Sequence, residues 1–465
     1  MRVHMMGICG TAMASLAGIL QEQGHEVRGS DQNVYPPMST QLEKLGIPLL
    51  EGYSPEHLQP RPDLVVVGNV ITRNNPEAQA LLESDIAYTS LPKALGEYVI
   101  QERQSLVVAG THGKTTTTAM LTSVADQCVP GAGFLVGGIP LSQQRSFRPP
   151  QNDWFIIEGD EYDTAFFDKV PKFIHYRPKY VILTGIEFDH ADIYSDISQI
   201  KEAFCQLIDL IPEEGTLVAN GDDPLVRELI GRARCSVFTY GGSSSPGKQG
   251  DLDYAMGPRQ NINGRNQFSV FYRGQSVGDI ALKSFGLHNS MNALACFALS
   301  HQLGWKRHQI LQGLAQFQGV KRRQEVLGSK GGQTIVEDFA HHPTAVRLTI
   351  EAMREQFPGQ RVIAVFEPRS ATSRRRVFQK DFVEALKGAD VVYLSPPFDQ
   401  SRIVESDRFS SEELVRDLVQ MGRRAHFHPS VDSIVRQIRA ESQPQDVVLV
   451  MSNGGFDNIY AKLLS

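Results

Sequence analysis

A short glycine-rich segment, Gly110-Thr111-His112-Gly113-Lys114-Thr115, combines residue types that bind nucleotide phosphates. Glycines let the backbone turn tightly, so that successive N–H groups point at one anion, and a lysine neutralises phosphate oxygens. A threonine directly after that lysine is where the G-x-x-x-x-G-K-[ST] pattern places a ligand of Mg²⁺. The first glycine of that pattern would fall at Val108, so the segment is a shortened variant. We predict a nucleoside triphosphate site centred on Lys114 and Thr115.

Two further apolar runs end in residues that could hold a cation. The run Trp154–Ile157 leads into Glu158–Asp163, where four acidic side chains lie within six residues. Crowded carboxylates repel one another unless a cation or a polar partner is present, and a solvated acidic turn is the alternative. The run Tyr180–Leu183 leads toward His190, which has acidic neighbours. Such a histidine ligates a metal, orients a phosphate, or serves only as a hydrogen-bonded structural residue.

These three groups support one another because each follows a strand of the same predicted sheet. The carboxyl ends of parallel strands meet at one edge of a sheet. Lys114, Glu158 and His190 would then surround a single triphosphate and its Mg²⁺ ions.

The elements that must position these groups predict an α/β protein. At 465 residues the chain is too long for one typical hydrophobic core, so we expect three domains. Residues 1–100 indicate a Rossmann-like domain in which Gly7 and Gly10 form the first tight turn. Asp31 follows the second strand, where it accepts from a ribose hydroxyl or only caps a turn. The expected elements are strands at 2–6, 25–29 and 63–68, a helix at 11–23 and a polar, ligand-facing loop at 69–76.

Residues 101–318 indicate a central P-loop ATPase domain with a parallel sheet. Within it, residues 266–282 alternate with a period near two around Arg273-Gly274, which predicts a small antiparallel hairpin. Asn289 and Asn292 lie three positions apart at the start of an apolar helix. They contact the edge of a base or cap that helix, and their spacing leaves both readings open.

Residues 319–465 indicate a second Rossmann-like domain. Asp338, His341 and Arg369 follow two of its predicted strands. An arginine at such a point is suited to bidentate binding of a carboxylate, and an ordinary surface charge is the alternative. The expected strands lie within 334–340, 361–370, 390–397 and 446–456, and the expected helices at 343–356 and 381–388.

Composition excludes several classes of protein. A net charge of −6 and a pI near 6.1 argue against a nucleic-acid surface. Five scattered cysteines without a C-x-x-C pair suggest neither a zinc site nor a disulfide framework and fit a reducing cytoplasm. The apolar N-terminus could be taken for a signal peptide, but Gly7 and Gly10 interrupt it, so we expect folded structure there. No apolar run reaches the ~20 residues that cross a bilayer. We expect a cytoplasmic monomer or weak homo-oligomer without membrane insertion.

Six motifs stand in the order found in the Mur ligases, which the whole chain resembles: GTHGKTTTT, EGDEYD, EFDHADIY, LHNSMNAL, GVKRRQE and EDFAHHPTAV. Those enzymes form amides with ATP during bacterial peptidoglycan synthesis. Five more segments are similar to the family's recycling branch: NVYPPMST, GNVITRNNPE, AFFDKVPKFIHY, FEPRS and VMSNGGF. The resemblance implies ATP and Mg²⁺ as cofactors. It also implies joining of L-alanyl-γ-D-glutamyl-meso-diaminopimelate to UDP-N-acetylmuramate through an acyl phosphate.

The resemblance also implies roles for individual positions. The catalytic residues would be Lys114, Glu158, His190 and Arg323, and the Mg²⁺ ligands Thr115, Glu158 and His190. ATP would be bound by Gly110, Thr111, His112, Gly113, Lys114, Thr115, Thr116, Asn289, Asn292, Arg323 and Asp338. The UDP-sugar would be bound by Gly7, Gly10, Asp31, Asn69, Thr72 and Asn75, and the carboxylates of the peptide by His341 and Arg369.

One stretch departs from several family members, which carry a lysine 14 or 15 residues after the histidine at this point. Carbamylation turns that lysine into a metal-bridging acid. The matching positions here are Phe204 and Cys205, and Lys201 is out of register, so we expect no carbamylated lysine. The second Mg²⁺ site must then be completed differently.

Three other functions stay open. A sibling ligase that adds L-alanine alone shares the HHP and GTHGKTT motifs but usually differs where this chain has FEPRS. A nucleotide-dependent oxidoreductase fits the N-terminal fold but leaves the phosphate loop, Glu158 and His190 unexplained. A non-catalytic nucleotide-binding module would use the same phosphate loop as a switch.

Overall fold

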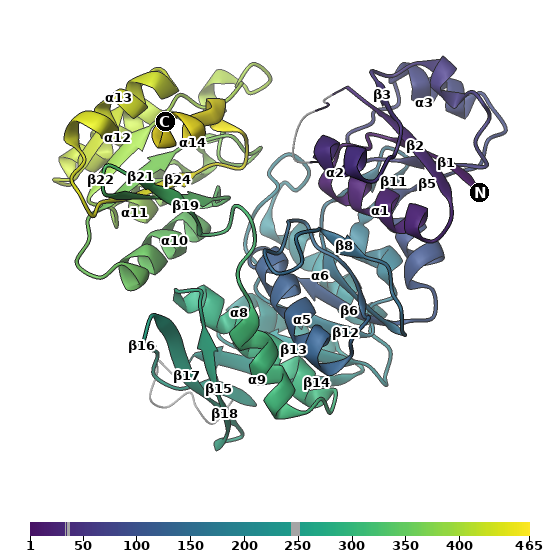
Figure 1. The fold of residues 1–465 in the computed structure, drawn as a ribbon, viewed down its shortest axis with the longest axis horizontal. Coiled ribbons are helices and arrows are strands. Elements are labelled where there is room, and N and C mark those ends of the chain that lie inside the picture. Colours follow the sequence, from purple (N-terminus) through teal and green to yellow (C-terminus); the bar gives the residue numbers. More distant parts are fainter. Residues whose placement is uncertain (33, 35–37, 243–251) are drawn as a thin grey trace.

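A computed structural model describes residues 1–32, 34, 38–242 and 252–465, which form three α/β domains around three large sheets (Figure 1). In Figure 1 the N-terminal sheet (purple) and the C-terminal sheet (green to yellow) lie on opposite sides of the view, with the central domain below and between them. Half of NVYPPMST and most of the polar loop 241–250 lie outside the described residues. The expected α/β class with three domains is confirmed.

The N-terminal sheet is wholly parallel, in the strand order β3-β2-β1-β4-β5. The chain turns from β1 into α1 at Gly7, where φ is +81° and the backbone N–H donates to the Ser30 carbonyl at 2.8 Å. A glycine adopts this φ without strain. The elements are β1 (Arg2–Met6), α1 (Thr11–Glu22), β2 (Glu26–Asp31), α2 (Met38–Lys44), β3 (Leu49–Glu51), β4 (Leu64–Val67), α3 (Pro76–Leu82), β5 (Tyr88–Ser90) and α4 (Leu91–Ala94).

The middle of the central sheet holds the three strands that were expected to share an edge. β6 (Gln104–Ala109) lies between β12 (Tyr180–Leu183) and β9 (Trp154–Gly159), and both pairings are parallel. The register aligns Leu183 with Ala109 and Ala109 with Gly159. These three strands therefore end at the same level, and the prediction that they share one edge is confirmed.

The predicted hairpin around Arg273-Gly274 is confirmed as β17 (Arg265–Tyr272) and β18 (Gln275–Leu282). It does not stand apart from the parallel sheet, because β15 (Tyr254–Met256) pairs with both β17 and β14 (Ser236–Gly242). Within the described part of the chain the hairpin thus extends one continuous sheet. The other strands are β7 (Gly133–Leu135), β8 (Phe147–Arg148), β13 (Thr216–Asn220) and β16 (Gln260–Ile262), and β10 (Asp163–Ala165) pairs with β11 (Asp168–Pro171) beside the sheet.

Two hydrophobic cores cover the two faces of this sheet, because side chains alternate along each strand. Leu106 and Val108 of β6 join the core with α5, α8 and α9, whereas Val107 and Ala109 face the core with α6. The phosphate loop thus leaves β6 between two packed layers. The helices are α5 (Lys114–Cys128), α6 (Ile197–Leu210), α7 (Pro224–Leu229), α8 (Leu287–Gln302) and α9 (Arg307–Gln316).

The C-terminal sheet has the order β19-β20-β24-β21-β22-β23. Its first strand, β19, is antiparallel to β20; neither β19 nor β23 was predicted. None of the helices among the described residues is long and apolar enough to cross a membrane. The elements are β19 (Glu325–Lys330), β20 (Gln333–Asp338), α10 (Pro343–Gln356), β21 (Val362–Phe366), α11 (Gln379–Leu386), β22 (Val391–Leu394), α12 (Ser411–Gln420), β23 (Arg424–Phe427), α13 (Val431–Glu441), β24 (Val447–Met451) and α14 (Ile459–Leu464).

Candidate active site

The phosphate loop packs tightly against the turn that follows β12. Gly110 has a φ of +128°, and a Cβ added there would lie 2.2 Å from Thr184 Oγ1. The Thr111 N–H donates to the Gly185 carbonyl at 2.9 Å, and Thr184 Oγ1 donates to the His112 carbonyl at 2.6 Å. The loop then opens into α5, whose N-terminal N–H groups favour an anion.

Lys114 lies among carbonyl and carboxylate oxygens. Its Nζ is 2.8 Å from Glu161 Oε2, 2.7 Å from the Gly110 carbonyl and 4.0 Å from Asp160 Oδ1. Burial alone would lower the pKa of Lys114, but the charges of Glu161 and Asp160 outweigh it and hold that pKa above its ordinary value. The side chain therefore brings a permanent positive charge to the edge of the sheet.

Thr115 and Glu158 meet as the sequence predicted. Thr115 Oγ1 donates to Glu158 Oε2 at 3.0 Å, and the Gly137 N–H donates to Glu158 Oε1. Burial raises the pKa of Glu158 above its ordinary value, so a neighbouring cation would stabilise its charged form. Hydroxyl and carboxylate oxygens are the ligands that Mg²⁺ prefers. The pair therefore has the right chemistry for such an ion.

His190 lies beside Glu161 rather than beside Glu158. Its Nε2 is 3.4 Å from Glu161 Oε1, and ligand atoms of Asp160, Glu161 and His190 all lie within 4.8 Å of one another. Asp160 also binds Lys172 Nζ. The sequence drew attention to this acidic run but did not single out Asp160 or Glu161.

The positions that carry a lysine in several family members lie away from this group. Phe204 of α6 is buried and stacks on Phe173 with ring centroids 6.2 Å apart, and Cys205 is buried too. Lys201 Nζ pairs with Glu228 Oε1 at 2.5 Å. Two other lysines reach the acidic group, because Lys114 contacts Glu161 and Lys172 contacts Asp160.

A cavity of about 340 Å³ opens between the central and C-terminal domains, next to the phosphate loop. Seven of the residues predicted to bind ATP line it. Neighbouring residues that the sequence reading did not name also line it, among them Tyr240, His288, Phe317 and Gln324. The seven predicted residues are His112, Gly113, Thr116, Asn289, Asn292, Arg323 and Asp338.

The two asparagines on α8 have different surroundings. Asn289 Nδ2 donates to the Phe285 carbonyl at 2.7 Å and to Gln324 Oε1 at 3.2 Å, so it secures the start of the helix to the next domain. Asn292 faces the phosphate loop, because a Cβ added at Gly113 would lie 2.9 Å from Asn292 Oδ1.

Arg323 and Asp338 approach the cavity from the C-terminal domain. The Arg323 guanidinium lies over the Phe339 ring, 4.8 Å from its centroid. Asp338 accepts from the N–H groups of Gln324 at 2.8 Å and Ala340 at 2.7 Å. Burial raises the pKa of Asp338, although the charge of Arg323 opposes that shift.

The residues predicted to bind the UDP-sugar gather at the carboxyl edge of the N-terminal sheet. Asp31 Oδ2 accepts from the Cys9 N–H at 2.9 Å, which ties the acid to the turn between Gly7 and Gly10. Asn75 caps α3 by accepting from two backbone N–H groups, at 3.0 and 3.1 Å. Asn69 and Thr72 are exposed on the same loop.

The two residues predicted to bind peptide carboxylates lie after β20 and β21. His341 Nδ1 donates to the Phe339 carbonyl at 2.9 Å. The Arg369 guanidinium lies 3.7 Å from the centroid of the Phe398 ring, and its Nη1 is 3.4 Å from Glu367 Oε1.

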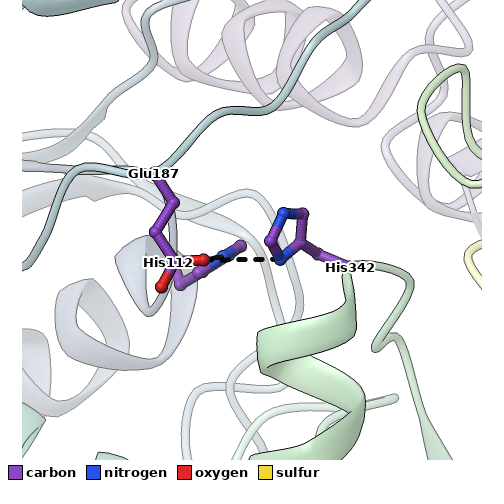
Figure 2. A group of neighbouring side chains, drawn as sticks. All are labelled: His112, Glu187 and His342. Carbon is purple, nitrogen blue, oxygen red and sulfur yellow. Dashed lines mark hydrogen bonds and ion pairs between the residues drawn. The ribbon is translucent and has the colours of Figure 1, made fainter. Parts of the chain in front are cut away.

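One group of polar residues at the domain boundary was missed by sequence reasoning. Glu187 Oε2 lies 3.3 Å from His112 Nε2 and 3.6 Å from His342 Nδ1 (Figure 2). Thr344 Oγ1 donates to the same Glu187 oxygen at 2.7 Å. The motifs that contain these residues stood out in the sequence, but nothing in their spacing paired them.

The chain matches three models of one family. These are "Mur ligase family, catalytic domain" over residues 2–103, "Mur ligase middle domain" over 108–300 and "Mur ligase, glutamate ligase domain" over 322–454. The chain is also similar to curated enzymes over its whole length. An Escherichia coli UDP-N-acetylmuramate–L-alanyl-γ-D-glutamyl-meso-2,6-diaminoheptandioate ligase is 39% identical, covering 100% of this chain and 98% of the relative.

Two further comparisons address the choice between family members. A UDP-N-acetylmuramate–L-alanine ligase from Agathobacter rectalis is 32% identical over 99% of this chain and 97% of the relative. The crystal structure of a murein peptide ligase from Psychrobacter arcticus matches with a TM-score of 0.75 and 33% identity, over 100% of this chain and 98% of that one. Full-length identity is thus higher to the peptide-adding enzyme than to the L-alanine-adding one.

Proposed function

Because this chain belongs to the Mur ligase family, whose members are ATP-dependent, ADP-forming amide ligases, we propose that it attaches L-alanyl-γ-D-glutamyl-meso-diaminopimelate to UDP-N-acetylmuramate. This reaction would return a peptide from degraded peptidoglycan to a cell-wall precursor. The observation that carries the proposal is the 39% identity over the whole chain to enzymes named for this substrate pair.

The chemistry needs ATP because a carboxylate is a poor electrophile. The lactyl carboxylate of UDP-N-acetylmuramate attacks the γ-phosphorus, ADP leaves, and an acyl phosphate forms. The free amine of the L-alanyl residue then attacks the acyl carbon, phosphate leaves, and a C–N bond closes. In the first step an anion approaches a polyanion, so the site must concentrate positive charge. Lys114 provides such a charge beside the phosphate loop.

Within this scheme Lys114 contacts the phosphates, and Arg323 reaches them from the C-terminal domain. Thr115 and Glu158 would hold one Mg²⁺ through their oxygens, which lie 3.0 Å apart. His190 would help hold a second ion together with Glu161, its neighbour at 3.4 Å. When bound, Mg²⁺ shields the charge of the triphosphate.

The binding subsites follow the three domains, which we divide at residues 100/101 and 318/319. The N-terminal domain binds the UDP-sugar, the central domain ATP, and the C-terminal domain closes over the nucleotide with the peptide. Each large sheet falls inside one of these ranges, which supports the division. Asn289, Asn292 and Asp338 face the nucleoside, and their position around one cavity supports that role. His341 and Arg369 bind the peptide carboxylates. We also propose that the enzyme works in the cytoplasm.

The test is ADP release with Mg-ATP and UDP-N-acetylmuramate, with L-alanine offered in one reaction and the tripeptide in the other. Mass spectrometry identifies the products. We expect turnover with the tripeptide. Turnover with L-alanine alone would assign the chain to precursor synthesis instead, which the 32% identity to L-alanine ligases keeps as the second candidate. The absence of ADP release in both reactions would refute the ligase assignment.

A further inference from the structure

Residues 187–189, which we call the docking segment, belong to the central domain and form hydrogen bonds with the C-terminal domain. They lie just after β12 and just before His190. Each of the three residues accepts one hydrogen bond from a side chain of the C-terminal domain. The contacts are Thr344 Oγ1 to Glu187 Oε2 at 2.7 Å, His342 Nε2 to the Phe188 carbonyl at 3.2 Å, and Thr372 Oγ1 to Asp189 Oδ1 at 2.7 Å.

The docking segment is equally tied to the phosphate loop. The Glu187 N–H donates to Thr111 Oγ1 at 2.9 Å, and that hydroxyl lies 3.1 Å from the Glu187 carbonyl. His112 Nε2 lies 3.3 Å from Glu187 Oε2. One carboxylate oxygen of Glu187 therefore contacts the phosphate loop on one side and the C-terminal domain on the other.

A single arrangement of protons satisfies Glu187, His112, His342 and Thr344 together. His342 Nε2 faces a carbonyl and must carry its proton, so His342 Nδ1 is free to accept from the Thr344 N–H at 3.3 Å. The Thr344 hydroxyl and His112 Nε2 both donate to Glu187 Oε2. Each converging atom thus has a hydrogen-bond partner, so the group is complete as a polar contact and needs no metal ion to hold it together.

The charge of Glu187 strengthens this contact. Burial alone would raise the pKa of Glu187, but the hydrogen bond and charge of His112, with the Thr344 hydroxyl, lower it to about 2. Glu187 is therefore ionised at neutral pH, and hydrogen bonds to an ionised acceptor are about twice as strong as neutral ones.

We propose that the docking segment couples closure of the C-terminal domain to the phosphate loop, with Glu187 and Thr344 as its positioning residues. A rigid rotation of the C-terminal domain would disturb all three contacts together, because they come from two separate parts of that domain, the start of α10 and the turn after β21. The next residue after the segment, His190, is then placed by the same contacts. This inference deepens the proposed function and rests on it for its turnover measurements.

The main test compares Thr344→Val with Thr344→Ser. Valine keeps the shape of threonine and removes the hydroxyl, whereas serine keeps the hydroxyl and removes a methyl group. We expect Thr344→Val to lower kcat about tenfold while the Kd of Mg-ATP stays within twofold, and Thr344→Ser to match wild type within twofold. Thr122→Val is the matched control, because it removes a buried hydroxyl inside α5, whose partner is the Ala119 carbonyl at 2.7 Å.

A double-mutant cycle separates the contact from general damage. If Glu187 and Thr344 act together, Glu187→Ala with Thr344→Val should be no slower than Glu187→Ala alone. Additive losses would overturn the coupling. So would a Thr344→Val enzyme with wild-type kcat, or a Thr344→Ser enzyme as slow as the valine variant.

Small-angle X-ray scattering tests the same contact without any turnover. With Mg-ATP and UDP-N-acetylmuramate, wild type and Thr344→Ser should have a smaller radius of gyration than Thr344→Val. Equal radii in all three proteins would overturn the inference. If wild type releases no ADP with either amine, the proposed function fails on its own, and the scattering result still decides whether the docking segment holds the domains together.

Discussion

The crowding of Gly110 against the turn after β12 predicts a specific cost for Gly110→Ala. The new Cβ would lie 2.2 Å from Thr184 Oγ1 and 2.9 Å from the Gly185 carbonyl oxygen. The threonine side chain could move, but the carbonyl is fixed by its hydrogen bond from the Thr111 N–H. The phosphate loop would have to shift away from the neighbouring strand end.

Two energies add in this substitution. A positive φ costs a non-glycine residue about 1–2 kcal/mol. Crowding an extra carbon into a packed site costs about 1–3 kcal/mol. Gly274→Ala separates the two, because Gly274 has a φ of +80° in the hairpin turn with no heavy atom within 4 Å of its added Cβ. Gly110→Ala should therefore be less stable than Gly274→Ala by about 1–3 kcal/mol.

Urea unfolding followed by tryptophan fluorescence measures this difference in the right domain. Both tryptophans, Trp154 and Trp305, lie in the central domain, with ring centroids 5.5 Å apart. The Kd of Mg-ATP, measured in the same samples, should rise for Gly110→Ala alone. If Gly110→Ala is as stable as Gly274→Ala and binds Mg-ATP like wild type, the tight packing of this loop is not what shapes the phosphate site.

Three other changes have defined outcomes. Lys114→Met should abolish ADP release and leave Glu161 without its main counter-charge, so that the variant is also less stable at pH 7 in a thermal unfolding scan. Glu158→Gln should raise the Mg²⁺ concentration needed for half-maximal ADP release, because a neutral amide replaces an anionic ligand. Burial lowers the pKa of His288 to about 4, so the folded state binds fewer protons than the unfolded state between pH 4 and 6.5. Stability should rise with pH by about 3 kcal/mol over that window, and His288→Asn should flatten the rise in urea titrations.

The sequence predicted those parts of the site that depend on local pattern and on sheet geometry. Lys114, Glu158 and His190 could be grouped because apolar runs mark parallel strands, whose carboxyl ends must share an edge. The contact between Glu187 and Thr344 could not be foreseen, since 157 residues separate the two and the contact depends on how two domains dock. For Asn75 the sequence predicted the position of the residue but not its contact. Its place on a ligand-facing loop was predicted, but spacing alone could not show that its side chain caps α3.

FEPRS and VMSNGGF, two of the segments similar to the recycling branch, contact each other in the structure. They follow β21 and β24, which are neighbours in the C-terminal sheet, and Ser452 Oγ donates to Glu367 Oε2 at 2.5 Å. A Cβ added at Gly454 would lie 2.1 Å from Arg369 Nε, so the second motif makes room for the arginine of the first.

Arg369 is thereby held between the Phe398 ring, Glu367 and the backbone of Gly454. A guanidinium fixed in this way loses little further freedom on binding a carboxylate, which favours recognition in one orientation. L-Alanine offers one carboxylate next to its reacting amine, whereas the tripeptide offers others farther away. Under the proposed role of Arg369 in binding a peptide carboxylate, Gly454 would therefore affect peptide choice without touching the peptide, because a side chain at Gly454 would displace Arg369.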